Sequence, residues 1–149
     1  MRKKSCVLAI GIFDGVHLGH RAILKKAVAE AKRLKVDPAV LTFQAHPSCV
    51  LRPSNPVKLL QTFEERRRAI EALGIKWIFS LHFTARLSRF TPSDFVDRVL
   101  FGQWDVRGVV VGKDFRFGRG RCGGVADLRR LLASRGARVW SVDAVRLGG

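Results

Sequence analysis

The sequence predicts an α/β protein built on one doubly wound, parallel sheet of five strands. Short apolar runs, several of them β-branched, alternate along the chain with segments whose apolar residues recur at helical spacing. The strand-like runs are residues 7–12, 39–43, 75–81, 106–111 and 138–142. The helical segments are residues 19–34, 63–73, 92–100 and 126–134. Because strands that alternate with helices form parallel sheets with helices on both faces, we expect a Rossmann-like arrangement.

Length and composition fit a single domain. The 149 residues are 47% hydrophobic, which is enough to bury a core without disulfides. The three cysteines, at positions 6, 49 and 122, are odd in number and form no C-x-x-C pair, so neither a disulfide framework nor a zinc ribbon is predicted. No apolar run is long enough to span a bilayer, and the run after the basic N-terminus leads into glycines instead of a cleavage site. We therefore expect a cytoplasmic protein with no membrane partner.

Breaker residues set the expected turns and loops. The Asp37-Pro38 pair predicts the turn before the second strand, because proline pushes the preceding residue out of helical geometry. Three prolines between residues 47 and 58 predict an irregular loop there. Residues 82–90 are also expected to form a loop.

Capping patterns set the expected helix ends. Thr62 and Glu65 have the spacing of a capping box at a helix start. Thr91-Pro92 is the pattern of a cap followed by proline in the first helical turn. Gly136 is expected to end the last helix.

A glycine-rich turn follows the first predicted strand and carries two histidines. Residues 9–21 read AIGIFDGVHLGHR, in which an apolar run gives way to glycines and then to a helical pattern. Glycines let the backbone approach a ligand, and a helix N-terminus offers free N–H groups, so this turn is typical of a phosphate site. His17 and His20 are three residues apart and can face one phosphoryl group if the first helical turn includes both. A zinc site is disfavoured because nothing nearby supplies the remaining ligands.

Three motifs, in this order, resemble those of one enzyme family. Residues 11–20 fit the pattern GxFDGVHxGH, which is similar to the HxGH signature of the nucleotidyltransferase superfamily. Residues 42–47, TFQAHP, resemble the motif TFxPHP, and residues 111–118, VGKDFRFG, resemble VGxDFRFG, continued by Arg121 and Gly123. Together they resemble the adenylyltransferase domain of the prokaryotic FAD synthetases over nearly the whole chain.

The resemblance implies a reaction and a place for its nucleotide. The phosphate of FMN would attack the α-phosphorus of ATP, giving FAD and pyrophosphate, so ATP and FMN are the expected partners. His17 and His20 would hydrogen-bond the triphosphate, and Mg²⁺ would arrive with ATP because the sequence shows no carboxylate cage. The strand order would be 3-2-1-4-5, which brings the loops after strands one, two and four to one crevice. The residues implied for the nucleotide seat are Gly11, Phe13, Asp14, Gly15 and Gly19.

The flavin side of the site is also implied by the resemblance. Two alternatives stay open from the residues themselves. The two phenylalanines of the third motif could pack on an isoalloxazine ring or anchor their loop in the core. His46 could serve only as a structural hydrogen-bond partner. The residues implied for this side are Thr42, His46 and Pro47 of the second motif and Asp114, Phe115, Arg116, Phe117 and Arg121 of the third.

Three features depart from the family pattern. Ala45 replaces a proline of TFxPHP, and Gly124 stands where an Asp or Asn commonly follows FGxxRxG. The sequence ends at Gly149, where the family continues into an ISSSxIR-like motif and a riboflavin kinase domain. Residues 1–149 are therefore expected to form an FMN adenylyltransferase domain without kinase activity, in which the missing phosphate contacts impair adenylyl transfer.

The charge of the chain supports a rival hypothesis. Twenty-eight Lys and Arg residues against twelve Asp and Glu give a formal charge of +16, which attracts polyanions without sequence preference. A basic nucleic-acid- or protein-binding module on the same fold is therefore one alternative, with residues 113–121 as its binding cluster. An HxGH adenylyltransferase with a different acceptor is another. We expect no specific nucleic-acid partner, because most of the bases are spread over predicted helix faces.

Overall fold

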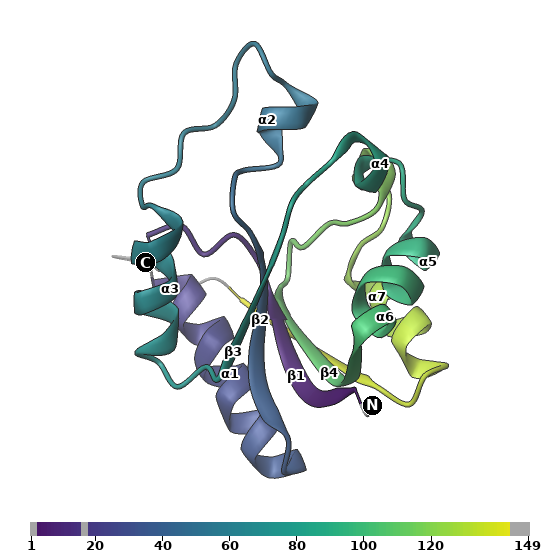
Figure 1. Cartoon of the computed structure of the whole chain (residues 1–149). Helices are drawn as coiled ribbons and strands as arrows, with labels where there is room; N and C mark the ends of the chain where they lie inside the picture. The colour runs from purple at the N-terminus through teal and green to yellow at the C-terminus, as the bar shows by residue number, and fades with distance from the viewer. Residues whose placement is uncertain (1–2, 16–17, 144–149) are drawn as a thin grey trace.

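The sheet has the predicted strand order. The computed structural model describes residues 3–15 and 18–143, and its five strands pair in parallel in the order β3-β2-β1-β4-β5 (Figure 1). The order reverses beside β1, so the carboxyl ends of β2, β1 and β4 lie at neighbouring positions along one edge. The strand bounds are β1 Lys4–Ile10, β2 Asp37–Phe43, β3 Trp77–Leu81, β4 Trp104–Gly112 and β5 Arg138–Val142.

Helices cover both faces of the sheet, as the doubly wound prediction requires. The longer ones are α1 Leu18–Leu34, α3 Phe63–Glu71 and α7 Val125–Ala133. The shorter ones are α2 Ser48–Leu51, α4 Ala85–Ser88, α5 Pro92–Asp94 and α6 Phe101–Gln103, with a π-helix at Phe95–Leu100 and a 3₁₀ turn at Arg119–Arg121. α1 and α3 lie on one side of the sheet, and α5, α6 and α7 lie on the other (Figure 1). In the part of the chain that the structure describes, no helix is long and apolar enough to cross a membrane.

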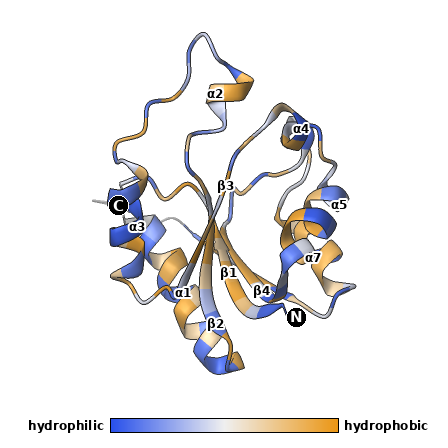
Figure 2. Cartoon of the chain, in the orientation of Figure 1, coloured by the Kyte–Doolittle hydropathy of each residue, from blue (hydrophilic) through white to orange (hydrophobic). Residues whose placement is uncertain are grey.

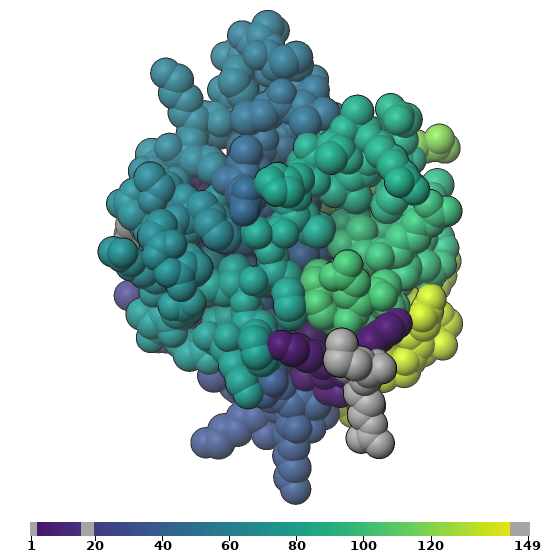
Figure 3. All heavy atoms as spheres, in the orientation of Figure 1, coloured from purple at the N-terminus to yellow at the C-terminus, as the bar shows by residue number. Residues whose placement is uncertain are grey.

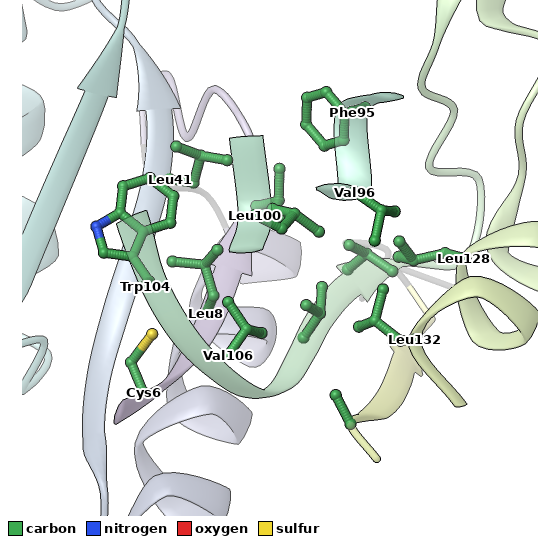
Figure 4. Packing of buried hydrophobic residues seen from close by; sticks show 14 of the residues in the cluster. Cys6, Leu8, Leu41, Phe95, Val96, Leu100, Trp104, Val106, Leu128 and Leu132 are labelled. Carbon is green, nitrogen blue, oxygen red and sulfur yellow. The ribbon is translucent and has the colours of Figure 1, made fainter. Parts of the chain in front are cut away.

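Each face of the sheet packs its own hydrophobic cluster. Successive residues of β1 alternate between the faces, so Leu8 joins one cluster while Val7 and Ala9 join the other, and all three are fully buried. Figure 4 shows the first cluster, with strand side chains beside those of the π-helix and α7. α1 and α7 each bury one side and expose the other, and both contain the hydrophobic and the hydrophilic residues that Figure 2 colours orange and blue.

Both predicted helix caps are present. Thr62 and Glu65 form a reciprocal capping box at the start of α3, in which each side chain accepts the backbone N–H of the other at 3.1 Å. Thr91 and Asp94 form a second box at the start of α5, with Pro92 in the first turn. The sequence patterns therefore locate both helix starts correctly.

Three segments differ in helix content from the prediction. The helix predicted at residues 92–100 begins as α5 but continues as a π-helix, a form that the sequence pattern does not distinguish from an α-helix. The predicted loop at residues 47–58 contains α2, and the one at residues 82–90 contains α4. Thr84 caps α4 by accepting the N–H of Leu87 at 3.1 Å. Single helical turns are too short to leave a periodic pattern in the sequence.

The turn before β2 comes earlier than predicted. Asp37 and Pro38 are the first two residues of β2, and Pro38 pairs with Val7 of β1. Proline fits there because the start of a strand can lack one N–H, and the Pro38 carbonyl accepts from Lys76 N at 2.9 Å. The chain turns instead at Lys35, whose φ of +59° lies in the left-handed region. The prediction is wrong because proline favours extended backbone before it, which a strand satisfies as well as a turn does.

Candidate active site

The three motif loops leave neighbouring strands at one edge of the sheet. The β1 loop (residues 11–15), the β2 loop (residues 44–47) and the β4 loop (residues 113–118) follow the carboxyl ends of β1, β2 and β4. Ligands of open α/β sheets bind at such a crevice. His20 lies in the first turn of α1, which also contains Gly19, whereas His17 lies outside the described residues.

The ring of Phe13 shapes the β1 loop. Phe13 has a φ of +57°, which is uncommon for a residue other than glycine, and its side chain is buried in the cluster under α1. The ring lies over Gly11, where a Cβ would come within 3.0 Å of Phe13 Cζ. It also meets the ring of His20 edge-on, with the centroids 5.4 Å apart. Gly11 and Phe13 therefore determine the path of the loop, and the Phe13 ring forms one side of the surroundings of His20.

Asp14 fastens the β1 loop to the segment before α3. Its carboxylate accepts hydrogen bonds from Leu60 N at 2.7 Å and from Gln61 N at 2.9 Å. Gly15, with a φ of +79°, donates its N–H to Gln61 Oε1 at 2.9 Å. Asp14 and Gly15 thus hold the loop in place against the segment before α3.

A buried arginine that the sequence analysis misses lies beneath two of the loops. Arg66 of α3 is 0% exposed. Its guanidinium donates to the carbonyl of Ile12 at 2.9 Å, of Phe43 at 2.9 Å and of Gln44 at 2.7 Å. Thr42, also fully buried, donates its hydroxyl to the same Ile12 carbonyl at 3.1 Å. Arg66 and Thr42 therefore join the β1 loop to the end of β2.

The sequence does contain a signal for this arginine. Arg66 belongs to a run of three arginines, which is typical of a solvent-facing helix surface. However, Arg66 precedes the buried Ile70 by four residues and so shares its face of α3, while Arg67 and Arg68 do not. The helical phase therefore separates Arg66 from its two neighbours.

His46 is held in the β2 loop through its Nδ1 atom. This nitrogen accepts the N–H of Ser48 at 3.0 Å and lies 2.9 Å from Ser48 Oγ, which in turn accepts the N–H of Val57 at 2.7 Å. Because Nδ1 is an acceptor, the neutral ring carries its proton on Nε2. Burial lowers the pKa of His46, the charge of Arg52 lowers it further, and the carboxylate of Asp14 opposes both. His46 thus combines a structural role with a neutral Nε2–H donor.

Beyond His46 the chain forms a projecting segment with apolar side chains. Pro47 leads into α2, which is apolar in Figure 2 and stands out from the body of the molecule in Figure 3. Leu51, Val57 and Leu60 are the large apolar residues with the greatest exposure among the described residues, at 57%, 43% and 83%. Leu60 Cδ1 lies 3.6 Å from where Gly15 would carry a Cβ. Apolar surface therefore borders the glycine-rich β1 loop.

The two phenylalanines of the β4 loop have different surroundings. Phe117 is buried in the first cluster beside Phe95, with the ring centroids 5.7 Å apart, and it exchanges two backbone hydrogen bonds with Gly123. Phe115 is half-buried and stacks on Phe117, with centroids 5.6 Å apart. Asp114 is exposed. Phe117 thus anchors the loop, while Phe115 and Asp114 keep accessible surface.

Arg116 folds back over its own loop. Its Nε donates to the carbonyl of Arg121, an exposed residue with a φ of +55°, at 3.1 Å. Its Nη1 lies 2.6 Å from where Gly124 would carry a Cβ, so the guanidinium occupies the space of a side chain at that position. Asp127 accepts the N–H of Gly124 at 2.9 Å, and this bond chiefly lowers the pKa of the Asp127 carboxyl. Gly124 stands where the family commonly has Asp or Asn, and the side chain of Arg116 occupies the space that such a side chain would need.

One cavity of the described residues lies away from these loops. It has a volume of about 540 Å³ and opens near the amino ends of β1 and β4. The cations that line it already have partners, because Lys3 donates to the Phe101 carbonyl at 2.7 Å and Arg107 lies 3.3 Å from Asp105. This cavity is therefore separate from the three motif loops, which are the basis of the candidate site.

Known proteins similar to this chain identify its family. A family model described as FAD synthetase matches residues 1–149. The chain belongs to the FAD synthetase family. Two curated relatives are bifunctional riboflavin kinase/FMN adenylyltransferases: that of Listeria monocytogenes is 38% identical over 130 residues, and that of Escherichia coli strain K12 is 30% identical over 147 residues. These matches cover 87% and 99% of this chain but 41% and 47% of the relatives, so it spans about half their length.

Solved structures share the fold of this FAD synthetase family member. The crystal structure of a macrolide-efflux protein from Streptococcus pneumoniae matches with a TM-score of 0.85 and 22% identity, over 99% of this chain and 49% of that one. A universal stress protein from Archaeoglobus fulgidus matches with a TM-score of 0.50 and 15% identity, over 95% of this chain and 93% of that one. At such identities the likeness concerns the fold alone.

Proposed function

We propose that this chain transfers the adenylyl group of ATP to FMN, forming FAD and releasing pyrophosphate. The observation that carries the proposal is the position of three motif loops at one crevice of the sheet, with the glycine-rich β1 loop leading into α1. Membership of the FAD synthetase family and the names of the curated relatives support it. Such a transfer depends on positioning and charge stabilisation and needs no protein nucleophile.

The start of α1 is assigned to the triphosphate. The helix has 17 residues, and its N-terminal N–H groups and dipole favour a negatively charged group. His20, together with His17, would donate hydrogen bonds to phosphate oxygens as charge develops on the departing pyrophosphate. The residues assigned to the seat of the nucleotide are Gly11, Phe13, Asp14, Gly15 and Gly19.

The carboxylates suit a metal ion that arrives with ATP. Among the residues that the structure describes, no group of three or more His, Cys, Asp or Glu side chains could hold a metal ion. Asp14, the carboxylate of the β1 loop, already accepts two backbone N–H groups. We therefore assign Mg²⁺ to the substrate, as MgATP, with phosphate oxygens and water as its ligands.

The β2 and β4 loops are assigned to FMN. His46 offers its Nε2–H as a donor, and Phe115 offers a half-exposed ring that an isoalloxazine ring can cover. Arg116 and Arg121 supply positive charge for the FMN phosphate. Thr42 and Phe117 are buried, so they act by holding these loops. The other residues assigned to this side are Pro47 and Asp114.

We place the reaction in the cytoplasm. Cys6, Cys49 and Cys122 are all free thiols, which suits a reducing compartment. Burial, assisted by the carboxylates of Asp105 and Asp37, raises the pKa of Cys6 to about 12, so this thiol stays protonated. ATP and FMN are the proposed partners there.

A direct assay tests the proposal. The chain is incubated with MgATP and FMN, and the formation of FAD and pyrophosphate is followed, with riboflavin as a matched acceptor that lacks the attacking phosphate. We expect FAD and pyrophosphate in equal amounts with FMN, and neither with riboflavin. Replacing His20 by Ala should lower the rate about 100- to 1,000-fold, because one donor to the developing charge is lost. Replacing the exposed His82 by Ala is the control and should leave the rate unchanged. A folded chain that releases no pyrophosphate with FMN contradicts the proposal.

A further inference from the structure

Arg66 lies where two substrate loops meet, but no motif includes it. Its side chain enters from α3 and contacts the β1 loop through the Ile12 carbonyl and the end of β2 through the carbonyls of Phe43 and Gln44. The β1 loop is assigned above to ATP and the β2 loop to FMN. One side chain therefore joins the backbone of both substrate sites.

The shape of the side chain makes this junction rigid. A guanidinium is planar, and its N–H groups point in fixed directions, so the carbonyls bonded to it keep a fixed spacing. The bonds to Ile12 and Phe43 both come from Nη1, and the bond to Gln44 comes from Nη2. A shift of either loop must therefore break a bond or move the other loop.

The buried charge of Arg66 depends on its hydrogen bonds to the two loops. Its hydrogen-bond partners are neutral oxygens, and Asp14 acts on it only through its charge, while burial lowers the pKa of the guanidinium. Its Nε has no hydrogen-bond partner among the described residues. A buried charge of this kind is costly, and without its donors the carbonyls of both loops would lose their partners, so the guanidinium and the two loops hold one another in place.

We propose that Arg66 is a positioning residue that couples the binding of ATP at the β1 loop to the binding of FMN at the β2 loop. The inference rests on the proposed function, because it assigns one substrate to each loop. A ligand that orders one loop fixes the guanidinium, and the other loop then loses less freedom when its own ligand binds. The coupling is reciprocal, so each ligand raises the affinity for the other by the same factor.

Calorimetry on the full chain measures this factor. FMN is titrated with and without α,β-methylene-ATP and Mg²⁺, and the analogue is titrated with and without FMN. In the wild type we expect each dissociation constant to fall about tenfold when the other ligand is present. Arg66→Lys keeps the charge but loses the planar fork, so each ligand should still bind alone and the factor should approach one. Arg67→Lys is the matched control, because Arg67 is the next residue of α3 and pairs with Glu64 and Glu71 on its surface.

Hydrogen exchange separates positioning from stability and does not depend on the proposed function. The amides of Gly11 and Gln44 donate to the carbonyls of Leu41 and Leu81 and report on the two loops. Both should lose protection together in Arg66→Lys, and neither in Arg67→Lys. Loss of protection in one loop alone, or in neither, would contradict the claim that Arg66 joins the two loops. Arg66→Met provides a second variant, which should lose the coupling and also bind each phosphate ligand more weakly.

The outcomes distinguish this inference from the proposed function. Coupling that persists in folded Arg66→Lys overturns the inference. Binding of both ligands without coupling in the wild type also overturns it but leaves the proposed function standing. Binding of neither ligand overturns the proposed function and the coupling with it, and the exchange measurement then still decides whether Arg66 joins the loops.

Discussion

His46 holds the β2 loop through one ring nitrogen, so protonation of this ring has a structural cost. Nδ1 accepts the N–H of Ser48, and Ser48 Oγ accepts the N–H of Val57. These two hydrogen bonds hold the two ends of the segment from Ser48 to Val57 together. A proton on Nδ1 would remove the acceptor and leave Ser48 without its partner. The loop assigned to FMN is therefore sensitive to acid.

The pH dependence of stability tests this role. The pKa of His46 is lowered in the fold by burial, from about 6.5 in an unfolded chain. Its contribution to stability is thus fully present above about pH 6.5 and is lost as the pH falls toward the folded pKa, because the unfolded chain takes up the proton first. His46→Asn keeps an acceptor in place of Nδ1 but does not titrate. We expect the melting temperature of the wild type, relative to this variant, to fall between pH 8 and pH 5. A constant difference over this range would contradict the assignment.

The pattern of residue types indicates which face of a helix is apolar, but it does not predict which individual side chains are buried. Phe115 and Phe117 are two apart and chemically identical, yet only Phe117 is buried in the core. Arg66 is charged, and its burial depends on three carbonyls that are distant in sequence, one from the β1 loop, one from the end of β2 and one from the β2 loop. Such sites follow from tertiary packing, which a single sequence does not contain.

Elements with local signals were predictable, and those without them were not. The fifth strand, residues 138–142, has the predicted bounds, and the capping boxes of α3 and α5 begin where their Thr residues stand. In contrast, the turn at Lys35 has no glycine or proline to mark it. Local chemistry therefore fixes helix starts more reliably than it fixes turns of unusual composition.

The cap of α3 links helix stability to the nucleotide loop. Thr62 caps α3, and the preceding residue, Gln61, bonds both Asp14 and Gly15 of the β1 loop. Thr62→Ala should lower the free energy of unfolding by about 0.5–2 kcal/mol, measured with urea, because a backbone N–H loses its acceptor. It should also weaken binding of the ATP analogue. Thr91→Ala removes the equivalent cap from α5 and is the control. If both variants weaken the analogue equally, the link to the β1 loop is wrong.

At the scale of the whole molecule, the strand order brings the site together. The motifs at residues 11–20, 42–47 and 111–118 are far apart in the chain, but β2, β1 and β4 are neighbours in the sheet. The alternation of elements predicts a parallel sheet, whereas its order was inferred from family resemblance. The periodicity of one sequence cannot rank the possible orders, since each buries a similar apolar surface.

The high positive charge predicts weak, nonspecific attraction to nucleic acids. The formal charge is +16, and long basic side chains lie exposed on α1, α3 and α7. Binding that rests on counterion release should fall linearly with salt on logarithmic axes, by about 10³–10⁵-fold between 50 and 200 mM if six to ten phosphates are contacted. Fluorescence anisotropy with labelled DNA duplexes of two different sequences measures this, and both should bind alike. A tight complex that resists salt and prefers one sequence would favour a nucleic-acid-binding module instead.

The sheet separates two hydrophobic clusters, and this separation bears on how such a chain diverges. Leu24 of α1 and Leu128 of α7 are both fully buried but belong to different clusters. Substitutions at distant sites without shared partners have additive effects on the free energy of unfolding. A packing change under α1 therefore needs no compensating change under α7. Along a lineage, the two halves of the core can drift at separate rates while the loops at the sheet edge stay fixed.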